Sequence, residues 1–174
     1  SFIPEETLQR KIRTDKVPYD LWVKQGWITT TSGAYVDYQY IKKYIQEMEQ
    51  KYQWIIKEIC YDKWNATQFA QEMDAEGYTM VEIIQGIKTL GEPTKDFRAQ
   101  VYSKNVIHNN NHVLTWAISN AVTRVDVNEN IMLDKAKSTE RIDPIAAVIN
   151  AYVRVMRLTI NETSVYEERG LITL

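Results

Sequence analysis

The chain has 174 residues, of which 44% are hydrophobic and 25% are charged, as in an ordinary globular domain. A net charge of −2 at pH 7 excludes a domain that holds DNA through a strongly basic surface alone, so any nucleic-acid contact must be local. The single cysteine, Cys60, excludes a disulfide framework and a cysteine-rich zinc site. Apolar runs are too short to cross a bilayer, and the N-terminus lacks the pattern of a signal peptide. We therefore expect a soluble intracellular protein.

The first fifty residues predict a short strand followed by helices. Residues 1–12 read as a strand end that turns into a charged helix, so we expect the chain to open in mid-fold. Pro18 precedes a short helical turn, and residues 26–33 predict an extended segment. Asp37 is placed to cap a helix. The apolar residues of that helix recur at helical spacing and predict one face packed on a sheet: Ile41, Tyr44, Ile45, Met48 and Tyr52.

The middle of the chain predicts a unit of strand, helix and strand. Residues 55–61 form a β-branched apolar run that is typical of a strand covered on both faces. Asn65 can cap the helix that follows, and residues 79–84 form a second strand. Since such units are right-handed crossovers, we expect the two strands to be parallel neighbours.

The second half predicts more helices around a hairpin. Pro93 suits the first position of a helix that ends near residue 104. Residues 113–121 predict a very apolar helix. The segments 124–127 and 131–133 flank a turn and predict a β-hairpin.

The end of the chain predicts one long helix and a tail. Residues 144–158 have apolar side chains at helical spacing, whereas residues 159–174 have the pattern of a tail. We therefore divide the chain into a domain at 1–158 and a C-terminal tail at 159–174.

Two acids stand out by their positions in these elements. Asp62 follows the first strand of the parallel pair and so lies at its carboxyl edge, where α/β sheets bind ligands. Asp143 opens the last helix. Hydrolysis of a phosphodiester with two divalent metals needs hard oxygen ligands of this kind. The alternative is structural: Asp62 can be a turn residue, and Asp143 followed by Pro144 is a good helix start.

Three cations precede the second acid. Lys135, Lys137 and Arg141 could meet a DNA phosphate beside the metals. They could equally form a solvated connector, because Asp134 and Glu140 interrupt the positive charge.

Other polar residues favour structural roles. His108 and His112 flank three asparagines, which favours a turn over a zinc site. Asn120, on the apolar helix, can hydrogen-bond the backbone near the site or satisfy a buried polar contact.

Several short motifs occur along the chain in a specific order. They are residues 2–6, 18–22, 61–66, 107–108, 113–116, 141–143 and 164–171, with Gly26, Asn111, Asn120, Lys135 and Lys137 between them. In this order the chain resembles the C-terminal nuclease domain of the tailed-phage terminase large subunit, of the kind with an HK97-like pattern.

The resemblance implies a ribonuclease H-like, three-layer α/β fold. It also implies a Mg²⁺- or Mn²⁺-dependent endonuclease that cuts concatemeric viral DNA, in which genomes are joined end to end, in the host cytoplasm. Asp62 and Asp143 match two of the family's metal-binding acids. Lys135, Lys137 and Arg141 would contact DNA, with His108 and Asn120 in support. The implied partners are double-stranded DNA, the portal protein, the small terminase subunit and an N-terminal ATPase domain.

The resemblance also implies that something lies upstream of this sequence. The family has a third catalytic Asp on a first strand ahead of residues 2–5, so we expect an N-terminally incomplete domain that is weak or inactive alone. No Walker A glycine loop is present in the sequence, so we expect the ATPase domain to lie outside these 174 residues.

Two other classes of function remain open. A non-catalytic packaging module could bind the portal, the small subunit or DNA without cutting. A Rossmann-like small-molecule domain is disfavoured, because neither turn after a strand carries a glycine-rich phosphate loop.

Overall fold

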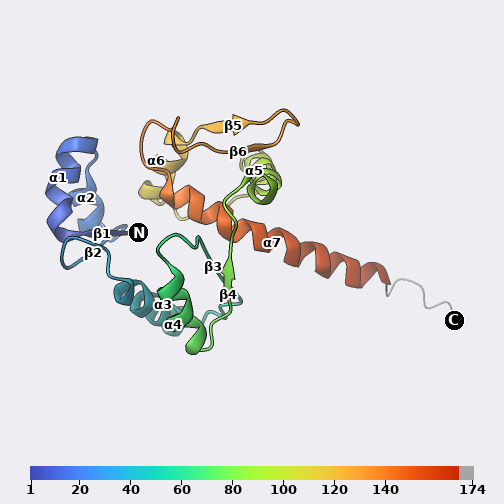
Figure 1. Ribbon diagram of the computed structural model, residues 1–174, viewed down its shortest axis with the longest axis horizontal. Helices are drawn as coiled ribbons and strands as arrows, with labels where there is room; N and C mark the ends of the chain where they lie inside the picture. Colours follow the sequence, from blue (N-terminus) through green and yellow to red (C-terminus); the bar gives the residue numbers. More distant parts are fainter. Residues whose placement is uncertain (169–174) are drawn as a thin grey trace.

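Six short strands and seven helices make up residues 1–168 of the computed structural model, the part of the chain that the structure describes, with side chains through Arg157 (Figure 1). In chain order they are β1 (Phe2–Pro4), α1 (Glu5–Asp15), α2 (Tyr19–Lys24), β2 (Thr29–Thr31), α3 (Tyr38–Tyr52), β3 (Ile59–Tyr61), α4 (Thr67–Ala75), β4 (Met80–Glu82), α5 (Ile87–Tyr102), α6 (His112–Asn120), β5 (Thr123–Val125), β6 (Ile131–Leu133) and α7 (Asp143–Glu168). The mixture confirms the α/β class.

The described strands pair two by two. β1 is parallel to β2, β3 is parallel to β4, and β5 is antiparallel to β6. The predicted parallel neighbours and the predicted hairpin are both confirmed. Among the described residues, no helix is long and apolar enough to span a membrane.

The first strand of the parallel pair is shorter and more exposed than the sequence predicts. β3 has three residues, and Ile55, which was expected inside the strand, is 78% exposed. Within the described residues β3 pairs only with β4, so its other edge has no ladder partner. A strand can extend only where a neighbouring strand pairs with its backbone N–H and C=O groups. This explains why residues 55–58, ahead of β3, are irregular.

α3 begins as predicted but packs differently. The Asp37 side chain accepts a hydrogen bond from the Gln39 amide at 2.9 Å, which confirms the cap. However, no residue of α3 is buried, so a sheet does not cover its apolar face as expected, although Tyr44 makes a ring contact with Phe2 of β1. Polar contacts to α4 and the turn after it include Gln39 to Glu72 and an ion pair between Lys42 and Glu76.

Two predicted helix starts are also corrected. Asn65 does not cap α4; its backbone is left-handed with φ of 59°, a conformation that Asn tolerates, and it makes a turn before the helix. Pro93 is inside α5, which begins six residues earlier at Ile87. The helix tolerates the proline because Leu90, Pro93 and Thr94 are buried, so packing offsets the lost backbone bond.

α7 is the element on which the second half of the fold is assembled. Ile145, Ile149 and Val153 recur every four residues and are at most 4% exposed. They pack against α5, α6 and the hairpin strand β6, while the C-terminal part of α7 extends beyond the other elements (Figure 1). The helix continues past residue 158 to Glu168, so the division into a domain and a tail stays a prediction, and residues 169–174 lie outside the described residues.

One ion pair ties α7 to the segment before β3. Arg154 donates two hydrogen bonds to the Glu58 carboxylate, at 2.6 and 2.7 Å. These bonds lower the pKa of Glu58 below its ordinary value. A carboxylate with a lowered pKa contributes stability above its unfolded pKa and loses it as the pH falls through the folded pKa.

We therefore expect Glu58→Gln to lower the free energy of unfolding at pH 7 by about 1 kcal/mol, the scale of a partly exposed bidentate pair. Urea denaturation of both proteins at several pH values checks this. The difference between them should shrink below the ordinary pKa of glutamate, and a difference that is constant with pH would contradict the assignment.

Candidate active site

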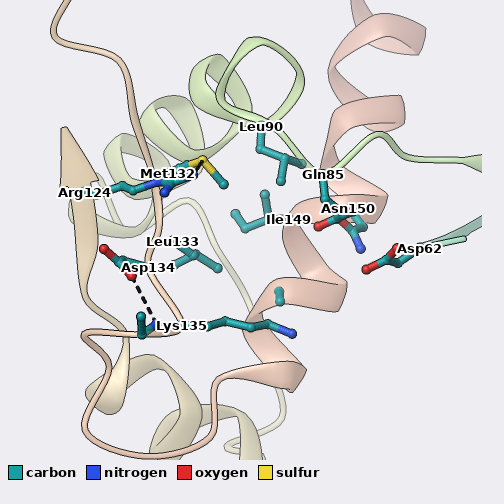
Figure 2. A pocket seen from close by; sticks show the side chains of 12 residues that line it. Asp62, Gln85, Leu90, Arg124, Met132, Leu133, Asp134, Lys135, Ile149 and Asn150 are labelled. Carbon is teal, nitrogen blue, oxygen red and sulfur yellow. Dashed lines mark hydrogen bonds between the residues drawn. The ribbon is translucent and has the colours of Figure 1, made fainter. Parts of the chain in front are cut away.

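The carboxyl ends of β3 and β6 meet α7 around an open pocket of about 370 Å³ (Figure 2). Its polar lining comes from separate segments of the chain: Asp62, Gln85, Arg124, Asp134, Lys135 and Asn150. Leu90, Met132 and Ile149 make the apolar wall. The site is therefore built where a parallel strand pair, a hairpin and a helix converge.

Asp62 is the first residue after β3. Tyr61 pairs with Glu82 of β4, and the Tyr61 carbonyl accepts the Ile83 amide at 2.8 Å, so the backbone is fixed up to that point. One carboxylate oxygen of Asp62 accepts the Trp64 amide at 3.1 Å. That bond orients the side chain, and Figure 2 shows it at the α7 side of the pocket. The other oxygen is free of protein hydrogen bonds within the described residues.

Asp143 is the first residue of α7. Its carboxylate accepts a hydrogen bond from the Lys135 ammonium at 3.0 Å, the one side-chain bond it makes among the described residues. A negative charge at this position also interacts favourably with the helix N-terminus. The charge of Asp143 thus stabilises the start of α7, while its carboxylate bonds Lys135, which follows the hairpin strand β6.

Asp143 does not line the pocket of Asp62, but it lies on the face of α7 that does. Asp143, Ala146 and Asn150 follow each other at i, i+3 and i+7, which is one face of a helix. Ala146 and Asn150 line the pocket of Asp62, so Asp143 lies about one turn away from that lining. Lys135 lines the pocket of Asp62, while its ammonium is bonded to Asp143.

Arg141 is engaged away from this pocket. Its Nε donates to Asp15 at the end of α1, at 3.2 Å, and the Tyr19 hydroxyl donates to the same oxygen at 3.0 Å. Burial alone would raise the pKa of Asp15, but hydrogen bonds from Thr14, Tyr19 and Arg141 outweigh it and lower that pKa. Burial and the neighbouring Asp15 raise the pKa of the Tyr19 hydroxyl. In this state Arg141 anchors the segment ahead of α7 to the N-terminal helices.

The remaining residues singled out from the sequence lie around the site or outside it. Lys137 is exposed on the turn after β6 and does not line the pocket. His108 is in irregular chain between α5 and α6, as the turn interpretation requires. Asn120 ends α6, where its side-chain Oδ1 accepts from the Thr139 hydroxyl at 3.4 Å and its side-chain Nδ2 is buried without a hydrogen-bond partner among the described residues. Thr139 belongs to the segment between β6 and α7, so Asn120 contacts that segment and not the pocket.

Sequence reasoning missed four polar residues of the pocket: Gln85, Arg124, Asp134 and Asn150. Gln85 follows β4, and its amide nitrogen donates to Asn150 on α7 at 3.2 Å. Asp134 follows β6 as Asp62 follows β3, and Figure 2 shows it on the other side of the pocket from Asp62. Signals for three of them were available in the sequence. Gln85 follows the predicted strand 79–84, Asp134 directly follows β6, and Asn150 lies two turns beyond Asp143 on the same helix face.

The donors at this place have the chemistry that Mg²⁺ and Mn²⁺ prefer. Carboxylate oxygens of Asp62 and Asp143 are hard ligands, and the Lys135 ammonium already occupies a cation's position beside Asp143. The set is nevertheless small. Within residues 1–168, no group of three or more His, Cys, Asp or Glu side chains converges to hold a metal ion. The donor chemistry of Asp62 and Asp143 therefore fits a divalent cation, with at most two carboxylates from the described residues.

Comparisons with known proteins indicate one family. A family model described as the terminase large subunit endonuclease domain matches residues 1–158. The terminase large subunit of Enterobacteria phage HK97 is 35% identical over 147 residues, which cover 83% of this chain and 29% of the relative. Protein YmfN of Escherichia coli strain K12 is 29% identical over 140 residues, covering 79% of this chain and 30% of the relative.

A solved structure is similar as well. The crystal structure of the HK97 bacteriophage large terminase matches with a TM-score of 0.80 and 34% identity, covering 88% of this chain and 32% of that one. The chain thus spans about three-tenths of the length of the relatives it matches. With a family model over residues 1–158 and a structural match of this closeness, the chain belongs to the family of terminase large-subunit endonuclease domains.

Proposed function

We propose that this chain is the cutting domain of a viral DNA-packaging terminase, and that it hydrolyses concatemeric double-stranded DNA with two Mg²⁺ or Mn²⁺ ions. The observation that carries the proposal is that Asp62 and Lys135 line one pocket, while Lys135 is bonded to Asp143, about one helical turn from the α7 residues that line it. Two bound ions would activate water and stabilise the leaving 3′ oxygen. Asp62 and Asp143 would hold them, and Lys135, Lys137 and, once released, Arg141 would bind backbone phosphates.

We further propose that a third carboxylate comes from residues upstream of Ser1, on a strand that completes a ribonuclease H-like core. Two features support this. The free edge of β3 can accept a further strand. A cavity of about 700 Å³ lies against the first residues of the chain, between β1 and the start of α7, with apolar walls that include Ile3, Trp116 and Val148. Alone, this chain would then bind metal weakly and cut little.

The other parts of the proposed function follow from family membership. Within the whole protein, the domain would be joined to an N-terminal ATPase and would act with the portal protein and the small terminase subunit in the host cytoplasm. His108 and Asn120 would support the site indirectly, since neither lines the pocket. The alternative is a packaging module that binds these partners without cutting DNA, and it requires no metal at Asp62 and Asp143.

Titration with Mn²⁺ separates the two. We expect Asp62→Asn and Asp143→Asn each to weaken Mn²⁺ binding at least about tenfold, because each removes a charged ligand. Calorimetry or the signal of free Mn²⁺ in electron paramagnetic resonance measures it. Asp74→Asn, an exposed acid on α4, is the charge-matched control and should leave the affinity unchanged. Equal Mn²⁺ binding by all four proteins would favour the non-catalytic module.

A further inference from the structure

Lys135 stands on a rigid turn but reaches out on a flexible side chain. One oxygen of Asp134 accepts the amides of Ala136 and Lys137 at 3.1 and 3.3 Å, and the Ser138 hydroxyl donates to the Asp134 carbonyl at 2.7 Å. The Asp134 amide in turn donates to the Val122 carbonyl at 2.8 Å. The Lys135 backbone is therefore held in place, and only its side chain has freedom to move.

The side chain spans the distance between the hairpin and α7. Figure 2 shows it extended across the pocket toward α7, on the side where the Asp62 carboxylate also lies. Its ammonium ends 3.0 Å from the Asp143 carboxylate. Both side chains of this pair are 67% exposed, so solvent screens the attraction and the pair separates easily.

We propose that Lys135 is a built-in counter-ion that occupies the cation position at Asp143 until metal binds, and is then released to hold a DNA phosphate. This rests on the proposed function, because the competing ligand is the metal of that site. A divalent ion at Asp143 would repel the ammonium and take its carboxylate. A lysine side chain, with its long stem and compact charge, can then turn outward to a backbone phosphate. Metal loading and DNA binding would thereby be coupled through one residue.

The coupling predicts that the contribution of Lys135 to DNA affinity depends on the state of Asp143. Without metal, Lys135→Met should change the affinity for a DNA duplex less than about twofold, because the ammonium is already occupied. Ca²⁺ takes the same oxygen ligands as Mg²⁺. With Ca²⁺ present, Lys135→Met should weaken DNA binding at least about fivefold, and the slope of log affinity against log salt should fall by the amount expected for about one lost phosphate contact. Fluorescence anisotropy over a salt series measures both, with gels to verify that the duplex is intact.

A second pair of variants tests the same claim without metal. Asp143→Asn releases Lys135, so Lys135→Met should now cost at least about fivefold in DNA affinity even in the absence of Ca²⁺. Lys137→Met is the matched control: it removes an equal charge two residues away and should cost the same in every condition. In addition, Lys135→Met should raise Mn²⁺ affinity about two- to fivefold, the scale of an exposed ion pair.

These experiments distinguish failure of the counter-ion role of Lys135 from failure of the proposed metal site. Loss of the Ca²⁺ effect with a retained Asp143→Asn effect would leave the counter-ion role intact and remove the metal from the account. An equal cost of Lys135→Met in all backgrounds and conditions, or no DNA binding at low salt by any of the proteins, would overturn the inference.

Discussion

Replacing Asp62 with alanine in a form of the protein extended upstream is expected to lower Mn²⁺-dependent DNA cleavage by more than about 100-fold, since it would remove a direct ligand of the proposed metal centre. Asp143→Ala should have an effect of the same size. The two should not add, because residues that hold one metal centre act as a unit. Conversion of supercoiled plasmid to nicked and linear forms measures the rate.

The chain of 174 residues provides the comparison for this experiment. We expect it to cut at a small fraction of the extended form's rate, because a third carboxylate is proposed to come from upstream. Asp74→Ala in the extended form should retain full activity, since that residue is exposed on α4 and does not line the pocket. Robust nicking by the short chain, or an Asp62→Ala protein as active as the parent, would contradict the proposed site.

Replacing Ile145 with alanine is expected to lower the free energy of unfolding by about 3 kcal/mol. Ile145 is 4% exposed and packs with Ala117 of α6 and Ile142 just ahead of α7. Truncation leaves a cavity at the point where α7 begins, two residues after Asp143. Urea denaturation followed by circular dichroism measures the change, and an unchanged slope with denaturant would show that both proteins unfold in the same way.

Two further variants show whether burial is the cause. Ile145→Val removes one methylene and should cost about 1 kcal/mol. Val127→Ala, at the tip of the hairpin where the side chain is 97% exposed, should cost less than about 0.5 kcal/mol. If Ile145→Ala were as mild as Val127→Ala, this cluster would not be what anchors the start of α7.

Local patterns in the sequence predicted most of the elements correctly. The Asp37 cap, the parallel β3–β4 pair and the β5–β6 hairpin depend on nearby residues and are confirmed. The errors arise where packing over long distances decides. Pro93 is tolerated in mid-helix because α5 is buried around it, and no local pattern indicates that. Residues 55–58 are irregular because the edge they would extend has no partner among the described residues.

The site shows the same division between local and long-range information. Position after a strand or at the start of a helix was enough to select Asp62 and Asp143. The ion pair of Lys135 with Asp143 spans eight residues across a turn, and that of Arg141 with Asp15 spans 126 residues. Neither follows from spacing. For the same reason Arg141 was predicted to contact DNA, whereas in the structure it bonds Asp15 of the N-terminal helices.

The central claim is that Asp62 and Asp143 hold divalent metal at one centre. Crystals of the protein soaked in Mn²⁺ and measured at the manganese absorption edge would locate the ion by its anomalous scattering. The account predicts a peak within coordination distance of both carboxylates, with the Lys135 ammonium moved away from Asp143. A peak elsewhere, or none at these acids with Lys135 still bound to Asp143, would contradict it.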